Sequence, residues 1–175
     1  MDATADELAG LVDLFGGLTR TELERACSEV AYRTDGSSVE TPTLEAAIES
    51  ARSSFALVRY ERAVPPAAGD EGTAPDDNGD GVSTEPLLVA GPTAFPSPPD
   101  HAEDLPHILD VEPRTIDRER LGERTRDRFA RAADEALESG SNDRIRHLLD
   151  VSYDLEAWAP IDCTSERARL DDALE

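Results

Sequence analysis

The most informative absence in this sequence is lysine, which occurs nowhere among its 175 residues. The 17 basic residues are therefore all arginines, they face 39 aspartates and glutamates, and the formal charge is −22. Large apolar residues are scarce as well. Leucine, isoleucine, valine and phenylalanine make up about a fifth of the chain, near the limit at which a highly charged sequence fails to form a core. No apolar run is long enough to span a membrane, which excludes an integral membrane protein.

The excess of acidic residues has two interpretations. One is an acidic surface that mimics nucleic acid or attracts basic proteins. The other is adaptation to concentrated salt, where acidic surfaces keep proteins soluble and lysine is avoided. The missing lysine and the single methionine favour the second interpretation. In molar salt the Debye length is about 3 Å, so the lack of a broad basic surface does not exclude DNA binding.

Cysteine is nearly absent too. Cys27 and Cys163 lie far apart without a CxxC context, and Cys27 falls on the apolar face of a predicted helix. We therefore expect a small buried side chain at Cys27 and neither a disulfide nor a metal pair. The first ten residues contain no basic segment and no apolar run, which predicts no signal peptide and a cytoplasmic location.

Motifs that carry chemistry are also missing. The three histidines, His101, His107 and His147, lack the spacing of metal ligands. Residues 76–81 resemble the start of a calcium-binding loop, but Leu87 stands where that loop needs a bidentate carboxylate. No nucleophile elbow and no glycine-rich phosphate loop occurs. We therefore expect no metal, no cofactor and no enzymatic activity.

Residues that favour regular structure cluster in the first half of the chain. The predicted elements are helices over 5–16, 20–35 and 41–55 and strands over 56–61 and 86–91. The second helix opens with a capping box formed by Thr19 and Glu22. Between the strands, residues 63–85 are too polar to bury a core, and a disordered acidic insert is expected there.

The second half is predicted to be helical. The expected helices cover 115–139, 142–150 and 164–174, with an aromatic turn of helix from Tyr153 to Trp158. Trp158, the only tryptophan, is expected to anchor these helices to the rest of the chain. A partner contact through this side chain is the alternative.

Together these elements predict a mainly α fold with a small β-hairpin. Three helices followed by two strands is the order of a winged-helix domain. We expect a winged-helix-like unit over 1–95, a proline-rich connector over 96–113 and a helical region over 114–175. The exposed face of the third helix would carry Glu45, Glu49 and Arg52, which suits base reading poorly.

One stretch of the sequence is locally basic. Residues 114–131 contain seven arginines and four acids, and helical spacing places Arg120, Arg124, Arg128 and Arg131 on one face. Such a stripe could contact a phosphate backbone or an acidic partner. Acids at helical spacing favour a second interpretation, internal pairs of Arg120 with Glu123, Arg124 and Arg131 with Asp127, and Arg131 with Glu135.

Three segments carry a resemblance to a known family. They are LAGLVDLFGGLTRTELERA at 8–26, AEDLPHILDVE at 102–112 and LLDVSYDLEAWAP at 148–160. The chain resembles a haloarchaeal family of unknown function, domain of unknown function 7109, across nearly its whole length. The resemblance implies a halophilic cytoplasmic protein and brings no activity or site residue.

Three functions remain open. The first is a non-enzymatic regulatory or adaptor protein that acts through contacts with a protein partner on a winged-helix-like scaffold. The second is a DNA-binding transcriptional regulator of high-salt cytoplasm, and the third is a small enzyme of unrecognised chemistry. Arginines of the stripe that lack internal pairs would favour DNA, and paired arginines would favour the adaptor.

Overall fold

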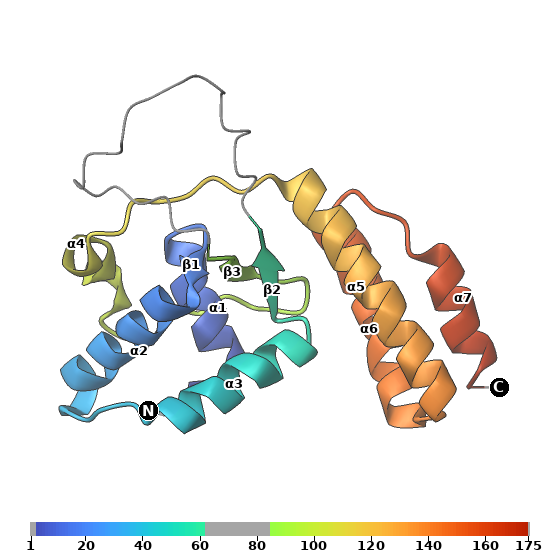
Figure 1. The fold of residues 1–175 in the computed structure, drawn as a ribbon, viewed down its shortest axis with the longest axis horizontal. Coiled ribbons are helices and arrows are strands. Elements are labelled where there is room, and N and C mark those ends of the chain that lie inside the picture. Colours follow the sequence, from blue (N-terminus) through green and yellow to red (C-terminus); the bar gives the residue numbers. More distant parts are fainter. Residues whose placement is uncertain (1–2, 62–84, 175) are drawn as a thin grey trace, which may run out of the picture.

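The computed structural model describes residues 3–61 and 85–174 (Figure 1). The insert expected over 63–85, apart from Glu85, lies outside the described residues, and so does the calcium-like motif at 76–81. None of the described helices is both long and apolar enough to cross a membrane.

The N-terminal unit is a small sheet covered by three helices. Its elements are α1 (Ala5–Leu14), β1 (Leu18–Thr19), α2 (Arg20–Asp35), α3 (Thr41–Ser53), β2 (Leu57–Tyr60) and β3 (Leu87–Ala90). Thr19 and Glu22 form the predicted capping box at the start of α2. The N-cap of α3 is Glu40, and no side chain caps this helix. Pro42 suits the first turn because that turn needs no N–H donor there.

The sheet is antiparallel with β3 at its centre, in the order β1-β3-β2. Val58 lies opposite Val89, and Tyr60 opposite Leu87. The sequence analysis found β2 and β3 but not β1, whose two residues are too few to show an alternating pattern. Leu57 and Leu88 belong to the core under the helices, whereas Val58 and Val89 belong to a second apolar cluster. Both faces of the sheet are therefore covered.

The connector is more structured than expected. A 3₁₀ turn over Ala102–Asp104 leads into α4 (Leu105–Leu109). Leu105 and Leu109, four residues apart, are buried against the N-terminal core. Pro106 lies within the first turn, where proline is tolerated. The proline-rich connector expected over 96–113 therefore contains a short helix.

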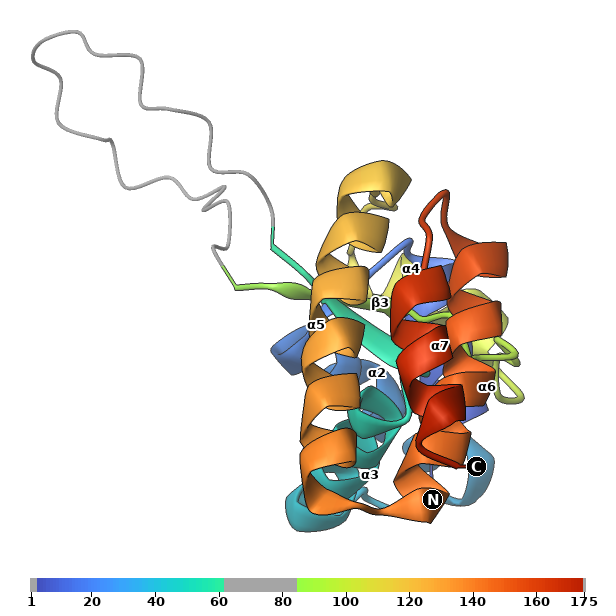
Figure 2. The same cartoon turned by 90° about the vertical axis from the view of Figure 1, so that its right-hand side faces the viewer.

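The C-terminal region is a three-helix bundle of α5 (Arg118–Ser139), α6 (Asn142–Trp158) and α7 (Thr164–Asp172), as Figures 1 and 2 show. The helix predicted over 142–150 and the aromatic turn after it form one continuous helix, α6. Val151 and Leu155 continue the buried stripe of its first turns. The Ser152 hydroxyl donates to the Leu149 carbonyl at 2.6 Å, which holds this serine within the helix.

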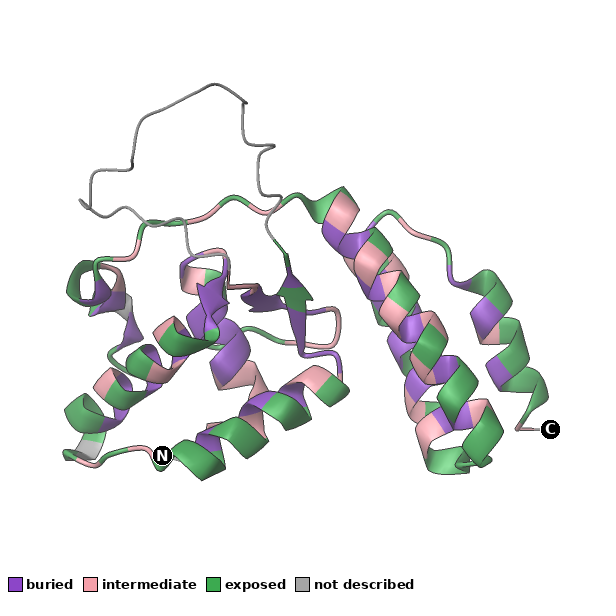
Figure 3. Ribbon diagram, in the orientation of Figure 1, coloured by how far each residue is buried: buried purple, intermediate pink, exposed green. Residues whose placement is uncertain are grey.

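Two apolar contacts join the bundle to the N-terminal unit. Phe55, just after α3, is fully buried and belongs to the bundle core, with its ring centroid 6.2 Å from that of Phe129. Leu121 of α5 packs against the outer face of the sheet, and Ile116 and Trp158 lie at the edge of that cluster. The burial colours of Figure 3 show the buried side of each bundle helix.

Candidate functional site

A cleft of about 490 Å³ opens where the bundle meets the sheet. It lies between the end of α3, the edge strand β2 and the exposed face of α5. Five arginines line it, together with two carboxylates: Arg52, Arg59, Arg124, Arg128 and Arg131, with Glu61 and Asp127. In a protein of charge −22, this cleft has an excess of positive side chains.

Local structure explains how these arginines come together. Arg124, Arg128 and Arg131 follow each other at helical spacing along α5, so they share one face. Arg59 is the one exposed residue of β2, and Arg52 lies in the last turn of α3. The docking of the bundle on the sheet brings these three elements side by side.

Arg128 is the most enclosed cation of the cleft. Its guanidinium donates a hydrogen bond to the backbone carbonyl of Arg52 and stacks on the Phe55 ring, 4.4 Å from the centroid. Burial lowers the pKa of Arg128 below its usual range, and the positive charges of Arg52, Arg144 and Arg131 add to this effect. Arg128 is thus held in place by neutral groups and repelled by its charged neighbours.

The ion pairs predicted within the stripe are wrong. Arg124 pairs with Glu61 across the cleft at 2.5 Å, and Arg52 pairs with Glu49 at 2.8 Å. None of the four pairs expected along α5 forms among the described residues; Arg124 binds Glu61 after β2 in place of Asp127.

Several cations of the cleft lack a carboxylate partner. Within the described ranges, Arg59, Arg128 and Arg131 make no ion pair. The Nε of Arg52 is buried and finds no hydrogen-bond acceptor among the described residues. The three arginines without an ion pair give the cleft unused capacity to bind an anion.

The other two predicted site residues lie outside the cleft. Arg120 does not line it, although its positive charge helps to lower the pKa of Glu61, after the larger effect of Arg124. Trp158 is half-buried against the apolar cluster at the outer face of the sheet, and the Arg118 guanidinium lies 5.7 Å from its ring centroid. This position fits the predicted anchor between bundle and sheet.

The sequence analysis missed Arg52 and Arg59 as cleft residues. Arg52 was noticed only as part of an exposed helix face. Arg59 carried a usable signal, because it is the single charged residue between the apolar residues of β2. A charge in the middle of a short apolar strand indicates an edge strand or a binding site.

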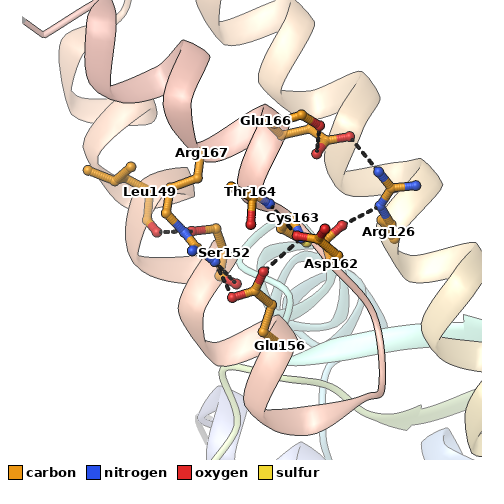
Figure 4. Close-up of polar contacts among 10 residues, drawn as sticks. Arg126, Leu149, Ser152, Glu156, Asp162, Cys163, Thr164, Glu166 and Arg167 are labelled. Carbon is orange, nitrogen blue, oxygen red and sulfur yellow. Dashed lines mark hydrogen bonds and ion pairs between the residues drawn. The ribbon is translucent and has the colours of Figure 1, made fainter.

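A second polar cluster ties α7 to α6 and α5 (Figure 4). Arg167 donates to the Ser152 hydroxyl at 2.9 Å and to the Glu156 carboxylate. Arg126 donates to the Asp162 carbonyl at 2.7 Å and to Glu166. Every polar group named here has a protein partner, so this cluster stabilises the bundle and leaves little free capacity for a ligand.

The cysteines are buried and unpaired, as predicted for Cys27. Burial raises the pKa of Cys27 to about 12, and the carboxylates of Glu24 and Glu7 act in the same direction. Burial likewise raises the pKa of Cys163 to about 11. Both thiols therefore stay protonated at neutral pH, which makes them poor nucleophiles and poor metal ligands.

The chemistry of the cleft follows from its side chains. Guanidinium groups stay charged, donate up to five hydrogen bonds and accept none. They neither move protons near neutral pH nor coordinate cations. In the part of the chain that the structure describes, no group of three or more His, Cys, Asp or Glu side chains is placed to hold a metal. The arrangement is suited to binding oxyanions.

The comparisons with known proteins agree with the resemblance seen in the sequence. The model of DUF7109, a family of unknown function, matches residues 6–175. No curated protein and no solved structure matches the chain. The match covers both the N-terminal unit and the bundle, and so both walls of the cleft.

Proposed function

The chain belongs to the DUF7109 family, and from its geometry we propose that it is a non-enzymatic regulatory or adaptor protein that acts through protein contacts. Its arginine cleft binds an acidic segment of a protein partner. One observation carries this proposal. A chain with 39 acidic residues leaves three cleft arginines without an ion pair among the described residues, although carboxylates are abundant elsewhere on its surface.

The element order supports a winged-helix-like scaffold. Three helices precede the β2-β3 hairpin, and β1 extends the sheet on the far side of β3. In such a scaffold the third helix is the one that would enter a DNA groove. Here its exposed face carries Glu45 and Glu49, which pair with Arg20 and Arg52. Carboxylates on that face repel phosphates, which favours a protein partner.

A halophilic cytoplasm fits the charge of the chain. The absence of lysine and the charge of −22 are typical of proteins that work in concentrated salt. Under those conditions exposed ion pairs are screened, whereas partly buried charges are screened less. A binding site in a cleft, with Arg128 enclosed at its wall, retains more of its attraction than an exposed patch would.

A DNA-binding regulator is the second candidate, and one observation favours it. Arg120, Arg128 and Arg131 of the stripe have no ion pair within the described residues, and this is the outcome that the sequence analysis expected of a protein that binds a phosphate backbone. The cleft itself argues the other way, since its arginines surround a concavity. A duplex is convex, and its phosphates would also meet Glu61 and Asp127.

Fluorescence anisotropy with a labelled octapeptide of Asp and Glu tests the proposal in molar KCl. We expect the full chain to bind the peptide and the double variant Arg59→Gln/Arg131→Gln to bind at least about tenfold more weakly, a loss of about 1.4 kcal/mol. Both arginines are exposed, so the double variant should fold.

Arg146→Gln is the matched control, because Arg146 is an exposed arginine of α6 outside the cleft. It should bind the peptide as the unchanged chain does. Absence of peptide binding would contradict the proposal, and so would equal loss in the control. Binding of a labelled duplex that the cleft variants abolish would establish the DNA candidate in its place.

A further inference from the structure

The two walls of the arginine cleft come from different parts of the fold. Arg52 and Arg59 belong to α3 and β2 of the N-terminal unit, whereas Arg128 and Arg131 belong to α5 of the bundle. Figure 2 shows the three bundle helices standing as one layer in front of the N-terminal unit. Anything that binds both walls at once also joins these two layers.

Attractive contacts across this junction are one ion pair, Arg124 with Glu61, and contacts with neutral acceptors and apolar groups. Phe55 inserts into the bundle core. Two arginines of the bundle donate to the exposed carbonyls at the end of α3, Arg128 to Arg52 and Arg144 to Ser53, the latter at 3.1 Å. Cations at the C-terminal end of a helix are favoured by the helix dipole.

Repulsion acts across the same junction. The positive charge of Arg52 acts on Arg128 from the other side of the junction, Arg144 and Arg131 add to it from within the bundle, and the Glu49 carboxylate opposes them. Arg59 and Arg131 add two more charges without an ion pair among the described residues. Like charges at this spacing disfavour the contact that brings them together. The arginines of the two walls therefore oppose docking at the cleft, where the Arg124–Glu61 pair favours it.

We infer that the cleft is a bridging anion site, whose ligand binds arginines of both walls at once and thereby holds the bundle on the sheet. The ligand class is a segment with at least two carboxylates, one for each wall. Arg59 on one wall and Arg131 on the other are exposed and make no ion pair within the described part of the chain, so both are available to such a ligand. This inference rests on the proposed function and adds to it a consequence, that partner binding tightens the docking of the two layers.

The thermodynamic expectation follows from linkage. A ligand that binds the docked form and not the undocked form stabilises docking in proportion to the logarithm of its concentration over its dissociation constant. Removal of an arginine from either wall has two opposite effects. It reduces the repulsion, so docking without ligand becomes stronger, and it removes one end of the bridge, so the ligand no longer strengthens docking.

The chain carries its own reporter for this experiment. Trp158 is the only tryptophan and packs beside the apolar cluster between bundle and sheet. Its emission reports docking, while circular dichroism reports helix content. Both signals are followed as KCl is lowered, with and without the Asp/Glu octapeptide. We expect the peptide to shift the Trp158 transition of the full chain to lower KCl.

Single variants of the two walls make the test specific. Without peptide, the Trp158 transition of Arg59→Gln and of Arg131→Gln should lie at a lower KCl concentration than that of the unchanged chain. Addition of the peptide should move the transition of either variant much less than that of the unchanged chain. Arg146→Gln should behave as the unchanged chain. A peptide shift that survives in either wall variant would show a one-sided site and overturn the inference. A Trp158 transition of the wall variants at a higher KCl concentration than that of the unchanged chain would overturn the inference as well.

The two proposals fail in different ways. If anisotropy detects binding while the Trp158 transition stays in place, the bridging inference is wrong and the partner site stands. If anisotropy detects no binding, the proposed function fails and the bridging inference fails with it.

Discussion

Glu22 receives hydrogen bonds from a neighbouring residue and from one far along the chain. Its carboxylate accepts two bonds from the Arg114 guanidinium, both at 2.7 Å, and one from the Thr19 N–H at 2.7 Å. Arg114 also donates to the Gly17 carbonyl at 2.8 Å. Burial by itself would raise the pKa of Glu22, but the bonds and charge of Arg114 and the bonds from Thr19 outweigh it and lower the pKa to about 2. This residue fixes the connector before α5 to the start of α2.

Replacement of Glu22 by Gln should reduce the free energy of unfolding by about 2 kcal/mol, because Arg114 loses its charged acceptor. The pKa of Glu22 is lower in the folded chain than its usual 4.5. Its contribution is therefore complete above pH 4.5 and is lost as the pH falls toward about 2. Urea denaturation of the variant and of the unchanged chain across this range measures both effects.

Glu29→Gln is the control, since Glu29 pairs with Arg33 on the exposed side of α2. Exposed pairs of this kind contribute less than about 0.5 kcal/mol. Equal losses from the two variants, or a Glu22 effect that persists unchanged at the lowest pH, would contradict this account.

For single residues, the sequence predicted contacts between positions that are close together in the chain. The Thr19–Glu22 capping box follows from spacing alone. The partnership of Glu22 with Arg114 spans 92 residues, and no periodicity connects such positions. The same holds for Arg124, for which Asp127 was predicted as partner and which pairs with Glu61 in the folded chain.

Among the elements, the junction after α3 depends on one aromatic residue. Phe55 adopts a left-handed backbone with φ of 67°, which costs about 1 kcal/mol for a residue other than glycine. The turn directs the ring into the bundle, where it meets Phe129 and Arg128. The neighbouring Gly91 permits this turn, because an added Cβ would lie 2.1 Å from the Phe55 carbonyl oxygen.

Phe55→Ala should cost about 3 kcal/mol, the lower end for a large buried aromatic. Phe95→Ala is the same change at a ring that is 78% exposed, and it should cost less than about 0.5 kcal/mol. Thermal unfolding in molar KCl compares the two variants. Similar losses at both positions would show that Phe55 does not hold the bundle to the N-terminal unit.

The β2-β3 hairpin should tolerate a shorter connection. Tyr60 lies opposite Leu87 at its open end, so a short turn can join the strands. Glu85 is kept, because its carboxylate accepts from the Arg20 N–H at 3.2 Å. Replacement of residues 63–84 by a short Asn-Gly turn should leave stability unchanged or slightly higher, since loop closure changes by only about 0.6 kcal/mol per doubling of length. A loss above roughly 2 kcal/mol in urea denaturation would show that the segment contributes to packing.

Elements with a long apolar stripe were predicted, and short ones were not. The apolar stripes of α1, α2, α3 and α5 predicted the bounds of these helices to within a few residues. β1, with two residues, and α4, with five, are stabilised by contacts with residues far along the chain. The break expected inside α6 was wrong because Ser152, a residue that often ends helices, is buried there and bonded to the preceding turn.

For the whole molecule, the charge of −22 opposes compaction. Eleven ion pairs occur among the described residues, far too few to neutralise 39 acids. Self-repulsion of this kind is reduced when salt shortens the Debye length. The apolar content is low, so burial of the core adds little stability to offset this repulsion.

We therefore expect folding to depend on salt. Circular dichroism across a KCl series should show loss of helix or a lower melting temperature in dilute buffer and full helix content in molar KCl. A sodium series separates screening from effects specific to potassium. Equal melting temperatures in dilute and molar salt would mean that the acidic surface does not limit stability.

The measurement that tests the central claim most directly is an NMR titration of the arginine side chains with the Asp/Glu octapeptide in molar KCl. The account predicts that the Nε–H signals of Arg59 and Arg131 shift most on saturation, because these two exposed arginines of the cleft gain a carboxylate partner. The signals of Arg33 and Arg146, outside the cleft, should stay in place. Shifts spread evenly over all arginines, or none at saturating peptide, would contradict a binding site in this cleft.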